Sequence, residues 1–438
     1  MRLNSIELRN FRGFEHLKIA FRPGLNVIAG VNGSGKTSIL KGVRELLNAM
    51  PAYTSMQGPL LAPFADGGSA RMLTTVSAGR YRFEEQYPIE MMATGDAFEQ
   101  PVEWSLKKSA EGGHAVWDGR TPGAVWQTLQ NTQGSVETPS VPFHTLPIVA
   151  YYPAYRKWEP SQPNQMSAAT ERLGRTDGYR MWWEAATNQD STALQQWVIS
   201  KTLERLQLTS ERGIKWESVH DDELAMVNVA LAAVVEGTTG IRYDLARKSV
   251  LIEWQGNTPP TEFYNLSDGQ RVAISLVVDI ARRMCLLNPH LDQAVTKVTP
   301  GVVLIDELDV HLHPKWQRLM TTGLQVAFPE VQFITTSHSP QVISELQPNQ
   351  VILMTPDGVT HPAISYGLDA SRVLDQIMGA SQRPIAVEEE LSDLFEALER
   401  NELPRARTLL VALKSTAPGI PELAGAEALL KRKEVLGR

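Results

Sequence analysis

The run GVNGSGKTS, residues 30–38, limits the possible folds of this chain more than any other feature. It fits the pattern G-x-x-x-x-G-K-[ST], and it lies between an apolar segment, residues 24–29, and a helical segment that begins near Lys36. Glycines allow backbone N–H groups to turn inward around phosphate oxygens, and the helix N-terminus adds a partial positive charge. A strand, this loop and a helix in this order predict an α/β fold with a phosphate-binding site.

The same loop indicates ATP with Mg²⁺ as the ligand. Lys36 would reach the β- and γ-phosphates, and the Thr37 hydroxyl would ligate Mg²⁺. A glycine-rich turn that matches the pattern by chance is the alternative, and the strand and helix in register count against it. The residues expected to bind ATP here are Gly30, Asn32, Gly33, Ser34, Gly35, Lys36, Thr37 and Ser38.

A second feature is an apolar strand that ends in two acids, GVVLIDELD, residues 301–309. Acids at the carboxyl end of a strand lie where an α/β sheet keeps its ligand. Asp306 would hold the Mg²⁺, directly or through water, and Glu307 would accept a proton from an attacking water. By themselves the two acids could simply cap the next turn, but the phosphate loop in the same chain favours the catalytic role.

A third feature is the segment FITTSHSP, residues 333–340, in which an apolar strand ends in a polar cluster. His338 would lie at the same edge of the sheet as the acidic pair. A histidine there can hydrogen-bond a γ-phosphate or polarise the attacking water. The alternative is a structural histidine, and the position one strand beyond the acids favours the catalytic role.

The stretch NLSDGQR, residues 265–271, opens a predicted helix at 268–287 and allows two interpretations. Ser267 could donate its hydroxyl to a phosphate, since Gly269 permits close approach and the helix N-terminus favours an anion. Ser267 and Gln270 also fit a helix capping box. Both interpretations use the same free N–H groups, so the local sequence leaves them open.

In this order, the phosphate loop, the helix start, the acidic strand and the histidine strand resemble the nucleotide-binding domain of the ABC ATPase superfamily. The resemblance implies a head-to-tail homodimer that sandwiches two ATP molecules. Ser267, Gly269 and Gln270 would then complete the ATP site of the partner chain.

The start of the chain, LRNFRGF, resembles the branch that contains RecF, the SMC proteins and the OLD-type ATPases. This resemblance places Arg12 near the phosphates, with a surface arginine on a turn as the alternative. The segment IDELDVHLHPKWQ resembles the D-loop of the OLD and RecF-like group, which places Asp309, His311 and His313 at the subunit interface. The two histidines could also suggest a metal site, but no third ligand is in view.

Within this branch the chain resembles the stand-alone prokaryotic defence ATPases that include PtuA of Septu and some retron systems. That resemblance implies an ATPase that senses or regulates a separate HNH-type nuclease, PtuB, in anti-phage defence. DNA or retron RNA/DNA would be a further partner. The alternative is a RecF-like DNA-repair ATPase that binds DNA directly, which a basic groove within residues 160–235 would favour.

Two departures from the ABC pattern affect the expected activity. Asp268 stands where ABC transporters have glycine, and this carboxylate would weaken attraction for a triphosphate unless it points away or pairs with Arg271. No clear glutamine loop is present; in VAYYPAYRKW, residues 149–158, Tyr152 or Arg156 could substitute for it. Such a chain could bind ATP as a switch and hydrolyse it slowly.

The predicted elements divide the chain into two lobes of one ATPase domain, an insertion and a tail. Strands and helices alternate after residue 266, which indicates a mixed, mainly parallel sheet with helices on both faces. The predicted boundaries are 1–50 for the N-terminal lobe, 51–255 for the insertion, 256–368 for the C-terminal lobe and 369–438 for a helical tail. Within the insertion we expect β-rich residues at 70–120, a loop at 121–143, a buried strand at 146–152 and helices at 176–236.

Composition excludes several classes of protein. The net charge of −7 argues against general affinity for nucleic acid, and the single cysteine, Cys285, allows no internal disulfide and no cysteine-based zinc site. The N-terminus has no signal-peptide pattern, and no segment has the length of a membrane span, so we expect a cytoplasmic protein. No long heptad tract or nuclease motif is found, which argues against SMC-type arms and a built-in nuclease.

Overall fold

A computed structural model describes residues 1–53, 61–77, 80–133, 144–156, 158, 173–185, 188–355, 358–379 and 383–436. Parts of the predicted loops and of the predicted groove, residues 54–60, 134–143 and 159–172, lie outside the described residues. The chain divides into two compact units, residues 1–367 and 368–438.

The first unit is built on a six-stranded sheet with the order β16-β15-β3-β14-β13-β9. Its strands are β3 (Leu25–Ala29), β9 (Ile148–Tyr152), β13 (Gly301–Ile305), β14 (Val331–Thr336), β15 (Val351–Thr355) and β16 (Gly358–Thr360). All neighbours pair in parallel except β15 and β16. Every residue of β3, β9, β13 and β14 is buried, because helices or a second sheet cover both faces.

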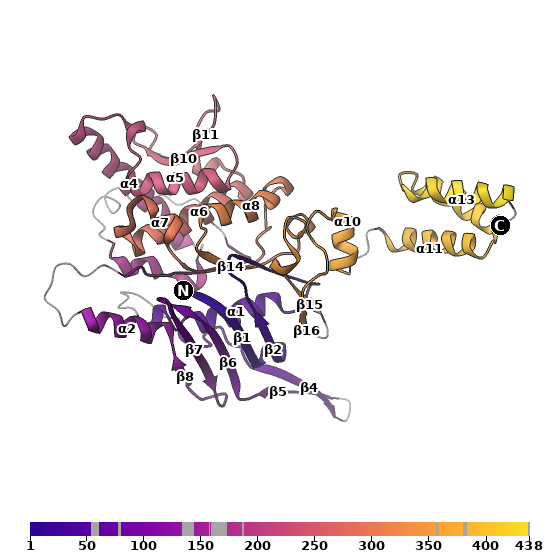
Figure 1. Ribbon diagram of the computed structural model, residues 1–438, viewed down its shortest axis with the longest axis horizontal. Helices are drawn as coiled ribbons and strands as arrows, with labels where there is room; N and C mark the ends of the chain where they lie inside the picture. Colours follow the sequence, from indigo (N-terminus) through magenta and orange to yellow (C-terminus); the bar gives the residue numbers. More distant parts are fainter. Residues whose placement is uncertain are drawn as a thin grey trace. The chain divides into compact units, whose positions relative to one another are not determined.

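The covering elements lie in separate layers (Figure 1). Helices α6 (Asp268–Leu287) and α8 (Pro314–Ala327) lie on one side of the six-stranded sheet, and α1 (Lys36–Leu47) lies on the other. The predicted α/β fold with a mixed sheet between helices is therefore confirmed. Short helices α7 (Val295–Val298) and α9 (Pro340–Ile343) complete this part of the unit.

A second, antiparallel sheet packs against α1. Its strands are β1 (Arg2–Phe11), β2 (Phe14–Ala20), β6 (Ile89–Ala97), β7 (Gln100–Lys108) and β8 (Ala115–Arg120), in the order β2-β1-β6-β7-β8. Strand β6 pairs with β1 along nearly its whole length, and β9 joins the main sheet beside β13. Residues 51–255 are thus not one insertion, because strands within this range complete sheets that the N-terminal and C-terminal lobes began.

Residues 121–133 differ from the predicted loop, because α2 (Pro122–Gln133) is a helix. The Thr121 hydroxyl accepts a hydrogen bond from the Ala124 N–H at 3.0 Å, and Pro122 occupies the first turn, where its missing N–H is not needed. Val125 and Trp126 are buried. The helix therefore depends on one cap and two anchoring side chains rather than on a regular apolar stripe. The hairpin of β4 (Arg71–Ser77) and β5 (Arg80–Gln86) precedes it in the chain.

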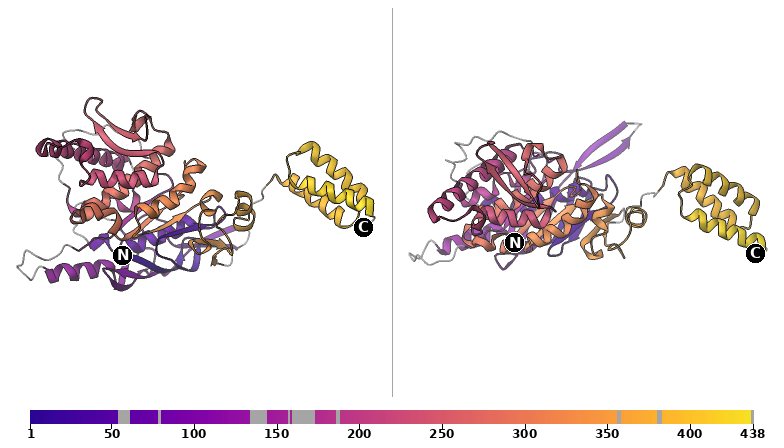
Figure 2. Two further views of the ribbon diagram at one scale, coloured as in Figure 1. Left: turned by 45° about the horizontal axis from the view of Figure 1, so that its top comes forward. Right: turned by 90° about the horizontal axis from the view of Figure 1, so that it is seen from above.

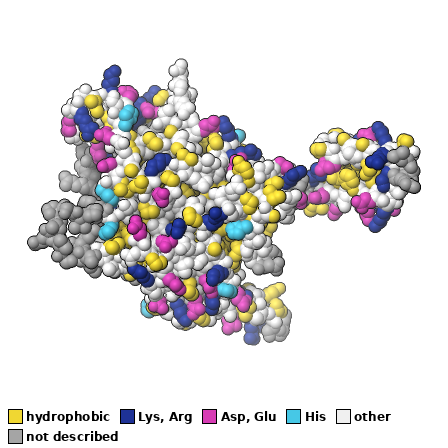
Figure 3. All heavy atoms as spheres, viewed as in Figure 1, with side chains coloured by type: hydrophobic (Ala, Val, Ile, Leu, Met, Phe, Trp, Pro, Cys, Tyr) yellow, Lys and Arg dark blue, Asp and Glu magenta, His cyan; other side chains and the backbone are white. Residues whose placement is uncertain are grey.

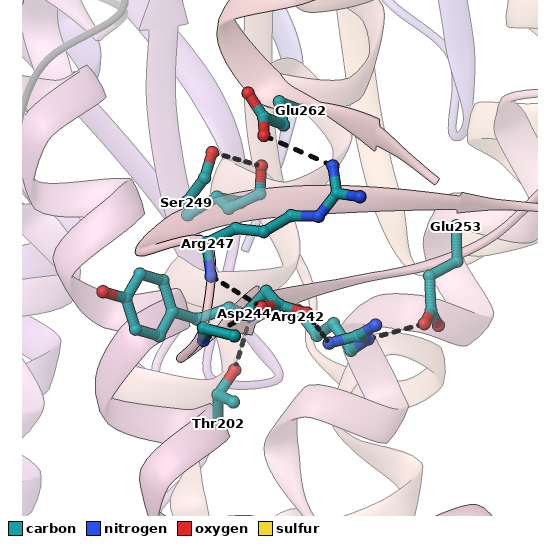
Figure 4. Close-up of polar contacts among 10 residues, drawn as sticks. Thr202, Arg242, Asp244, Arg247, Ser249, Glu253 and Glu262 are labelled. Atoms are coloured by element: carbon teal, nitrogen blue, oxygen red, sulfur yellow. Dashed lines mark hydrogen bonds and ion pairs between the residues drawn. The ribbon is translucent and has the colours of Figure 1, made fainter. Parts of the chain in front are cut away.

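A helical region leads into the predicted signature stretch. It contains α4 (Asn188–Arg212), α5 (Glu223–Val234) and a small sheet of β10 (Thr238–Asp244), β11 (Ser249–Trp254) and β12 (Thr261–Glu262). Asp244 caps the β10–β11 turn by accepting from the Arg247 N–H at 2.9 Å, and the Tyr243 N–H donates to Thr202 of α4 at 3.0 Å (Figure 4). These contacts fix the sheet from which the chain enters α6.

The second unit is a bundle of α11 (Ile385–Glu399), α12 (Leu403–Thr416) and α13 (Glu422–Leu436), preceded by α10 (Ala370–Arg372) (Figure 2). Its apolar core consists of Leu391, Leu394, Ala397, Leu398, Ala406, Leu410, Leu413, Leu423, Ala426 and Leu430. The remaining short helices are η1 (Pro51–Tyr53), η2 (Arg175–Tyr179), η3 (Trp182–Glu184), η4 (Trp216–Ser218), η5 (Phe263–Asn265), η6 (Pro289–Ala294), η7 (Pro348–Gln350) and η8 (Val373–Ile377). Among the described helices, none is both long and apolar enough to cross a membrane.

Candidate functional site

The glycine-rich loop connects β3 to α1 and has a backbone that only glycine adopts easily. Gly30, Gly33 and Gly35 have φ angles of 152°, 82° and 93°. A Cβ atom on Gly35 would lie 2.6 Å from the ring of Phe14, so the β1–β2 turn lies directly against the loop. The loop is therefore both turned inward and supported from the second sheet.

Lys36 lies inside this loop and is only 6% exposed. Its ammonium group donates to the carbonyl oxygens of Gly30 at 3.0 Å and Val31 at 2.8 Å. Burial lowers the pKa of Lys36, although the nearby Asp306 and Glu307 act in the opposite direction. The result is a desolvated cation held where a phosphate would enter the loop.

Asp306 brings three elements together at the carboxyl edge of the main sheet. Its Oδ1 atom accepts from the Thr37 hydroxyl of α1 at 3.2 Å and from the Thr336 hydroxyl of β14 at 2.6 Å. A hydroxyl beside a carboxylate is the kind of oxygen pair that Mg²⁺ prefers, with water and phosphate supplying the other ligands. Among the described residues, no group of three or more His, Cys, Asp or Glu side chains could hold a metal ion. The Thr37 hydroxyl and the Asp306 carboxylate are oxygen donors of the type that could hold Mg²⁺ together with a nucleotide.

Glu307 follows Asp306 in a left-handed backbone conformation, with φ at 49°. Its N–H donates to Thr336 at 2.7 Å, which fixes the turn at the end of β13. Arg156 donates to the carbonyl oxygens of Asp306 at 2.6 Å and Glu307 at 2.9 Å. The Tyr152 hydroxyl instead donates to Asp279 of α6 at 2.8 Å. Of the two residues that could substitute for the glutamine loop, only the side chain of Arg156 hydrogen-bonds to the end of the acidic strand.

His338 and Asp309 lie near the same edge. His338 is half-buried, and burial, together with the positive charge of Lys36, lowers its pKa. Asp309 accepts a hydrogen bond from the Ser337 hydroxyl at 2.6 Å, which ties the D-loop to the end of β14. His311 has a φ angle of 62°, so the D-loop turns sharply before α8. The predicted site residues after β13 and β14 are thus neighbours.

The signature stretch forms the cap that the sequence allowed. The Gln270 N–H donates to the Ser267 hydroxyl at 3.3 Å, and the Ser267 N–H donates to the Gln270 side chain at 3.0 Å. Asp268 is 81% exposed at its side chain and lies 3.4 Å from Arg271, so the carboxylate is paired with this arginine. Among the described residues, no hydrogen bond or ion pair joins Ser267 or Gln270 to the glycine-rich loop of the same chain.

Arg12 lies on the β1–β2 turn with a φ angle of 52°. Its guanidinium is 3.9 Å from Asp66, which also contacts Lys41 at 3.2 Å and Arg44 at 2.9 Å. Burial by itself would raise the pKa of Asp66, but Arg44 and Lys41 outweigh it and lower the pKa. The turn that carries Arg12 also carries Phe14, the residue that touches Gly35, so Arg12 lies on the element that supports the loop.

Two cavities lie away from this cluster. One, of about 780 Å³, is lined by residues such as Arg175, Trp197 and Cys285, and the other, of about 820 Å³, includes Trp216 and Tyr243. Neither is lined by a residue of the glycine-rich loop, the acidic pair or the signature stretch. Burial raises the pKa of the Cys285 thiol well above its usual range, which indicates an unreactive, buried residue.

Comparison with known proteins agrees with this geometry. The family described as AAA domain matches residues 5–211, and the family described as AAA domain, putative AbiEii toxin, Type IV TA system matches residues 198–344. The chain is 23% identical to a retron Ec83 probable ATPase of Escherichia coli over 437 residues, covering 88% of this chain and 77% of that protein. The chain is similar to ABC-type ATPases over most of its length.

Further similar proteins cover different shares of the chain. The chain is 22% identical to the Septu protein PtuA of Bacillus thuringiensis, over 87% of this chain and 85% of that protein. It is 37% identical over 148 residues to a retron Vc95 probable ATPase of Vibrio cholerae serotype O1 biovar El Tor, a match that spans 33% of this chain and only 28% of that protein. A solved SMC head bound to the C-winged helix domain of ScpA is similar at 14% identity and a TM-score of 0.44, covering 83% of this chain and 98% of that chain. The predicted resemblance to retron and Septu ATPases is confirmed.

Proposed function

We propose that this ATPase binds and hydrolyses ATP with Mg²⁺ as a head-to-tail dimer and thereby regulates a partner nuclease in anti-phage defence. The observation that carries the proposal is the convergence of Thr37, Asp306 and Thr336 at one sheet edge. That convergence joins the glycine-rich loop to the acidic strand, as ATP hydrolysis requires.

In this proposal each residue has a separate task. Lys36 and the loop N–H groups bind the β- and γ-phosphates, while Thr37 and Asp306 would hold Mg²⁺, which neutralises phosphate charge when bound. Glu307 accepts a proton from the attacking water. His338, whose pKa is lowered by burial, is neutral at physiological pH and hydrogen-bonds near the γ-phosphate.

A second copy of the chain would complete each site. The helix start at Ser267 has a capping hydroxyl and a positive dipole end, and the exposed Asp268 beside it is paired with Arg271. It makes no hydrogen bond to its own glycine-rich loop among the described residues, which supports action on the partner's ATP. Ser267, Gly269 and Gln270 would then contact the partner's phosphate, with Asp309 and His311 at the interface.

The downstream role rests on the relatives. The retron Ec83 probable ATPase and the PtuA of Bacillus thuringiensis are similar to this chain over most of its length. The family resemblance implies an HNH-type nuclease of the PtuB kind as the partner. A retron RNA/DNA would be a further component. We propose that ATP-dependent opening and closing of the dimer controls the partner nuclease.

Direct DNA binding of the RecF kind has less support in the described residues. Several basic side chains of residues 173–235 are paired with acids, as in Lys201 with Glu223 and Arg212 with Asp221. Figure 3 shows lysine and arginine side chains interspersed with acids on the face in view. Within the described part of this region, these ion pairs offset positive charge that phosphate binding would use.

Three variants test the proposal. Lys36→Ala should lose ATP binding, and Glu307→Gln should bind ATP, hydrolyse it at least about 100-fold more slowly and accumulate the dimer. Ser267→Arg should bind ATP as a single chain but fail to close into the dimer. The readouts are nucleotide affinity, phosphate release and mass by light scattering with and without ATP and Mg²⁺. Wild-type turnover in Glu307→Gln would show that Glu307 is not the base, and closure in Ser267→Arg would leave Ser267 as a cap alone.

Co-purification tests the partner separately. The full chain should retain an HNH nuclease encoded beside it, with retention that changes between Lys36→Ala and Glu307→Gln. Equal retention by both variants would separate nuclease binding from the ATP cycle and contradict ATP-dependent control.

A further inference from the structure

Arg156 is a buried cation outside the motifs that define the ATP site. It lies in the turn after the edge strand β9, and its side chain is among the largest that are fully buried, with 1% exposure. Its guanidinium donates to three main-chain carbonyl oxygens, those of Pro153 at 3.2 Å, Asp306 at 2.6 Å and Glu307 at 2.9 Å. Arg156 therefore joins the turn after β9 to the end of the acidic strand.

The position is unfavourable for an arginine that serves packing alone. Among the described residues Arg156 forms no ion pair with a side-chain carboxylate, although burying a cation without one is costly. Burial lowers its pKa to about 10, and Asp306, Asp309 and Glu307 act in the opposite direction. Arg156 therefore remains charged at neutral pH and places a fixed positive charge behind the three acids.

The two carbonyl groups that Arg156 holds belong to the residues proposed to bind Mg²⁺ and to act as the base. Glu307 has a φ angle of 49°, a backbone conformation that a non-glycine residue adopts only at some energetic expense. Its N–H is held by Thr336, and its carbonyl oxygen is held by Arg156. The peptide units on both sides of Glu307 are thus fixed from two neighbouring strands.

We infer that Arg156 is a positioning residue for ATP hydrolysis. Its two hydrogen bonds to the Asp306 and Glu307 carbonyl oxygens fix the backbone so that the Glu307 carboxylate faces the attacking water. The inference rests on the proposed function and assigns Arg156 no contact with ATP. This role differs from that of a glutamine loop. The side chain of a glutamine-loop residue would be expected to act directly on the metal or the water.

Arg156→Met and Arg156→Lys test this role. Methionine keeps an unbranched, apolar side chain but removes the charge and the donors, so kcat should fall by about 100-fold while ATP affinity changes by less than about threefold. Lysine keeps the charge but presents a point cation instead of a planar fork, so it should restore kcat only in part. Arg175→Met is the matched control, because Arg175 also donates to main-chain carbonyls, those of Leu287 and His144, away from the acidic strand.

The measurements are kcat, KM, ATP affinity by direct titration, and thermal unfolding of each full-length variant. A structural role alone would lower ATP affinity and unfolding temperature together with kcat, in Arg156→Met and Arg175→Met alike, and would overturn the inference. Wild-type kcat in a folded Arg156→Met would also overturn it. If Arg156→Met does not fold, Arg156→Lys is the deciding variant. Wild-type kcat in Arg156→Lys would show that the planar guanidinium is not needed, and would overturn the inference. A wild-type chain that hydrolyses no more ATP than Lys36→Ala would instead refute the proposed function, and the inference with it.

Discussion

A Cβ atom on Gly269 would lie 2.2 Å from the carbonyl oxygen of His311. The start of the signature helix and the D-loop of the same chain are therefore in direct main-chain contact. Because the obstructing atom belongs to the backbone, a larger side chain cannot be accommodated by rotating a neighbour away. Two segments proposed to face the partner chain are thus held as one surface, and the fold itself requires glycine at this position.

Gly269→Ala should weaken ATP-dependent dimer closure by about tenfold or more, because the D-loop or the helix start must shift at an expense of about 1–3 kcal/mol. ATP affinity of the single chain should change by less than about twofold, since Lys36 and the glycine-rich loop are not touched. Light scattering and nucleotide titration measure the two effects. Asp268→Ala is the control, because that side chain is 81% exposed, and its closure should match wild type. Equal closure by Gly269→Ala and wild type would contradict the rigid contact.

Arg12→Ala should weaken ATP binding by about tenfold through loss of one positive charge beside the loop. Arg12 lies close to the loop because Phe14, two residues further along the chain, touches Gly35. The Arg12 guanidinium lies 3.9 Å from Asp66. Arg9→Ala offers a control, since Arg9 is exposed on the neighbouring strand β1 and pairs with Glu7. Nucleotide titration at low salt measures the ATP affinity of both variants. Identical affinities would show that Arg12 is a surface arginine without a role in ATP binding.

The pH dependence of kcat/KM should report His338. Burial and Lys36 lower the pKa of His338 below its ordinary value of 6.5, so the neutral imidazole is fully present above pH 6.5 and is lost as the pH falls through the lower pKa. We expect kcat/KM to be insensitive to this group from about pH 8 down to about pH 6.5 and to decline only at lower pH. His338→Gln should remove that acidic decline. A decline that begins above pH 6.5 and is absent in His338→Gln would contradict the lowered pKa.

Asp279→Asn should destabilise the first unit by about 3–5 kcal/mol, because it leaves two buried arginines without their carboxylate. Asp279 is fully buried and accepts from Arg282 at 2.6 Å and Arg283 at 2.7 Å. Thermal and urea unfolding measure the loss. Asp221→Asn is the control, since its pair with Arg212 is nearly half exposed on both sides and should contribute little to stability.

The same carboxylate should make stability depend on acid. Burial by itself would raise the pKa of Asp279, but Arg283 and Arg282 outweigh it and hold the pKa below its ordinary value of 3.8. Its contribution is therefore complete above pH 3.8 and disappears as the pH falls through the lower, folded-state pKa. The free energy of unfolding of Asp279→Asn should lack this part of the pH dependence. If the free energies of wild type and Asp279→Asn fell in parallel down to low pH, Asp279 would not be the group responsible.

Much of the candidate site could be predicted because its motifs are local. The glycine-rich loop, the acidic pair and the signature cap each occupy fewer than about ten residues. The positions of their glycines, hydroxyls and carboxylates indicate the local backbone conformation. The roles of Arg156 and Gly269 could not be predicted, because each depends on a contact with a segment more than 40 residues away in the chain. The same reason explains why the sequence predicts an insertion for strands β6 to β8, although β6 pairs with β1 and β7 and β8 extend the same sheet.

The sequence alone determined an α/β fold with a phosphate loop, an acidic strand and a histidine strand in the ABC order. Those features need only short-range chemistry, namely glycines where φ is positive, apolar runs where strands are buried and hydroxyls where helices begin. The tertiary structure decided how the segments contact one another: Thr336 and Thr37 meet at Asp306, Arg156 holds the acidic turn, and Asp268 pairs with Arg271. These relationships depend on which strands become neighbours in the sheet, and that follows from packing of the whole chain rather than from any single motif.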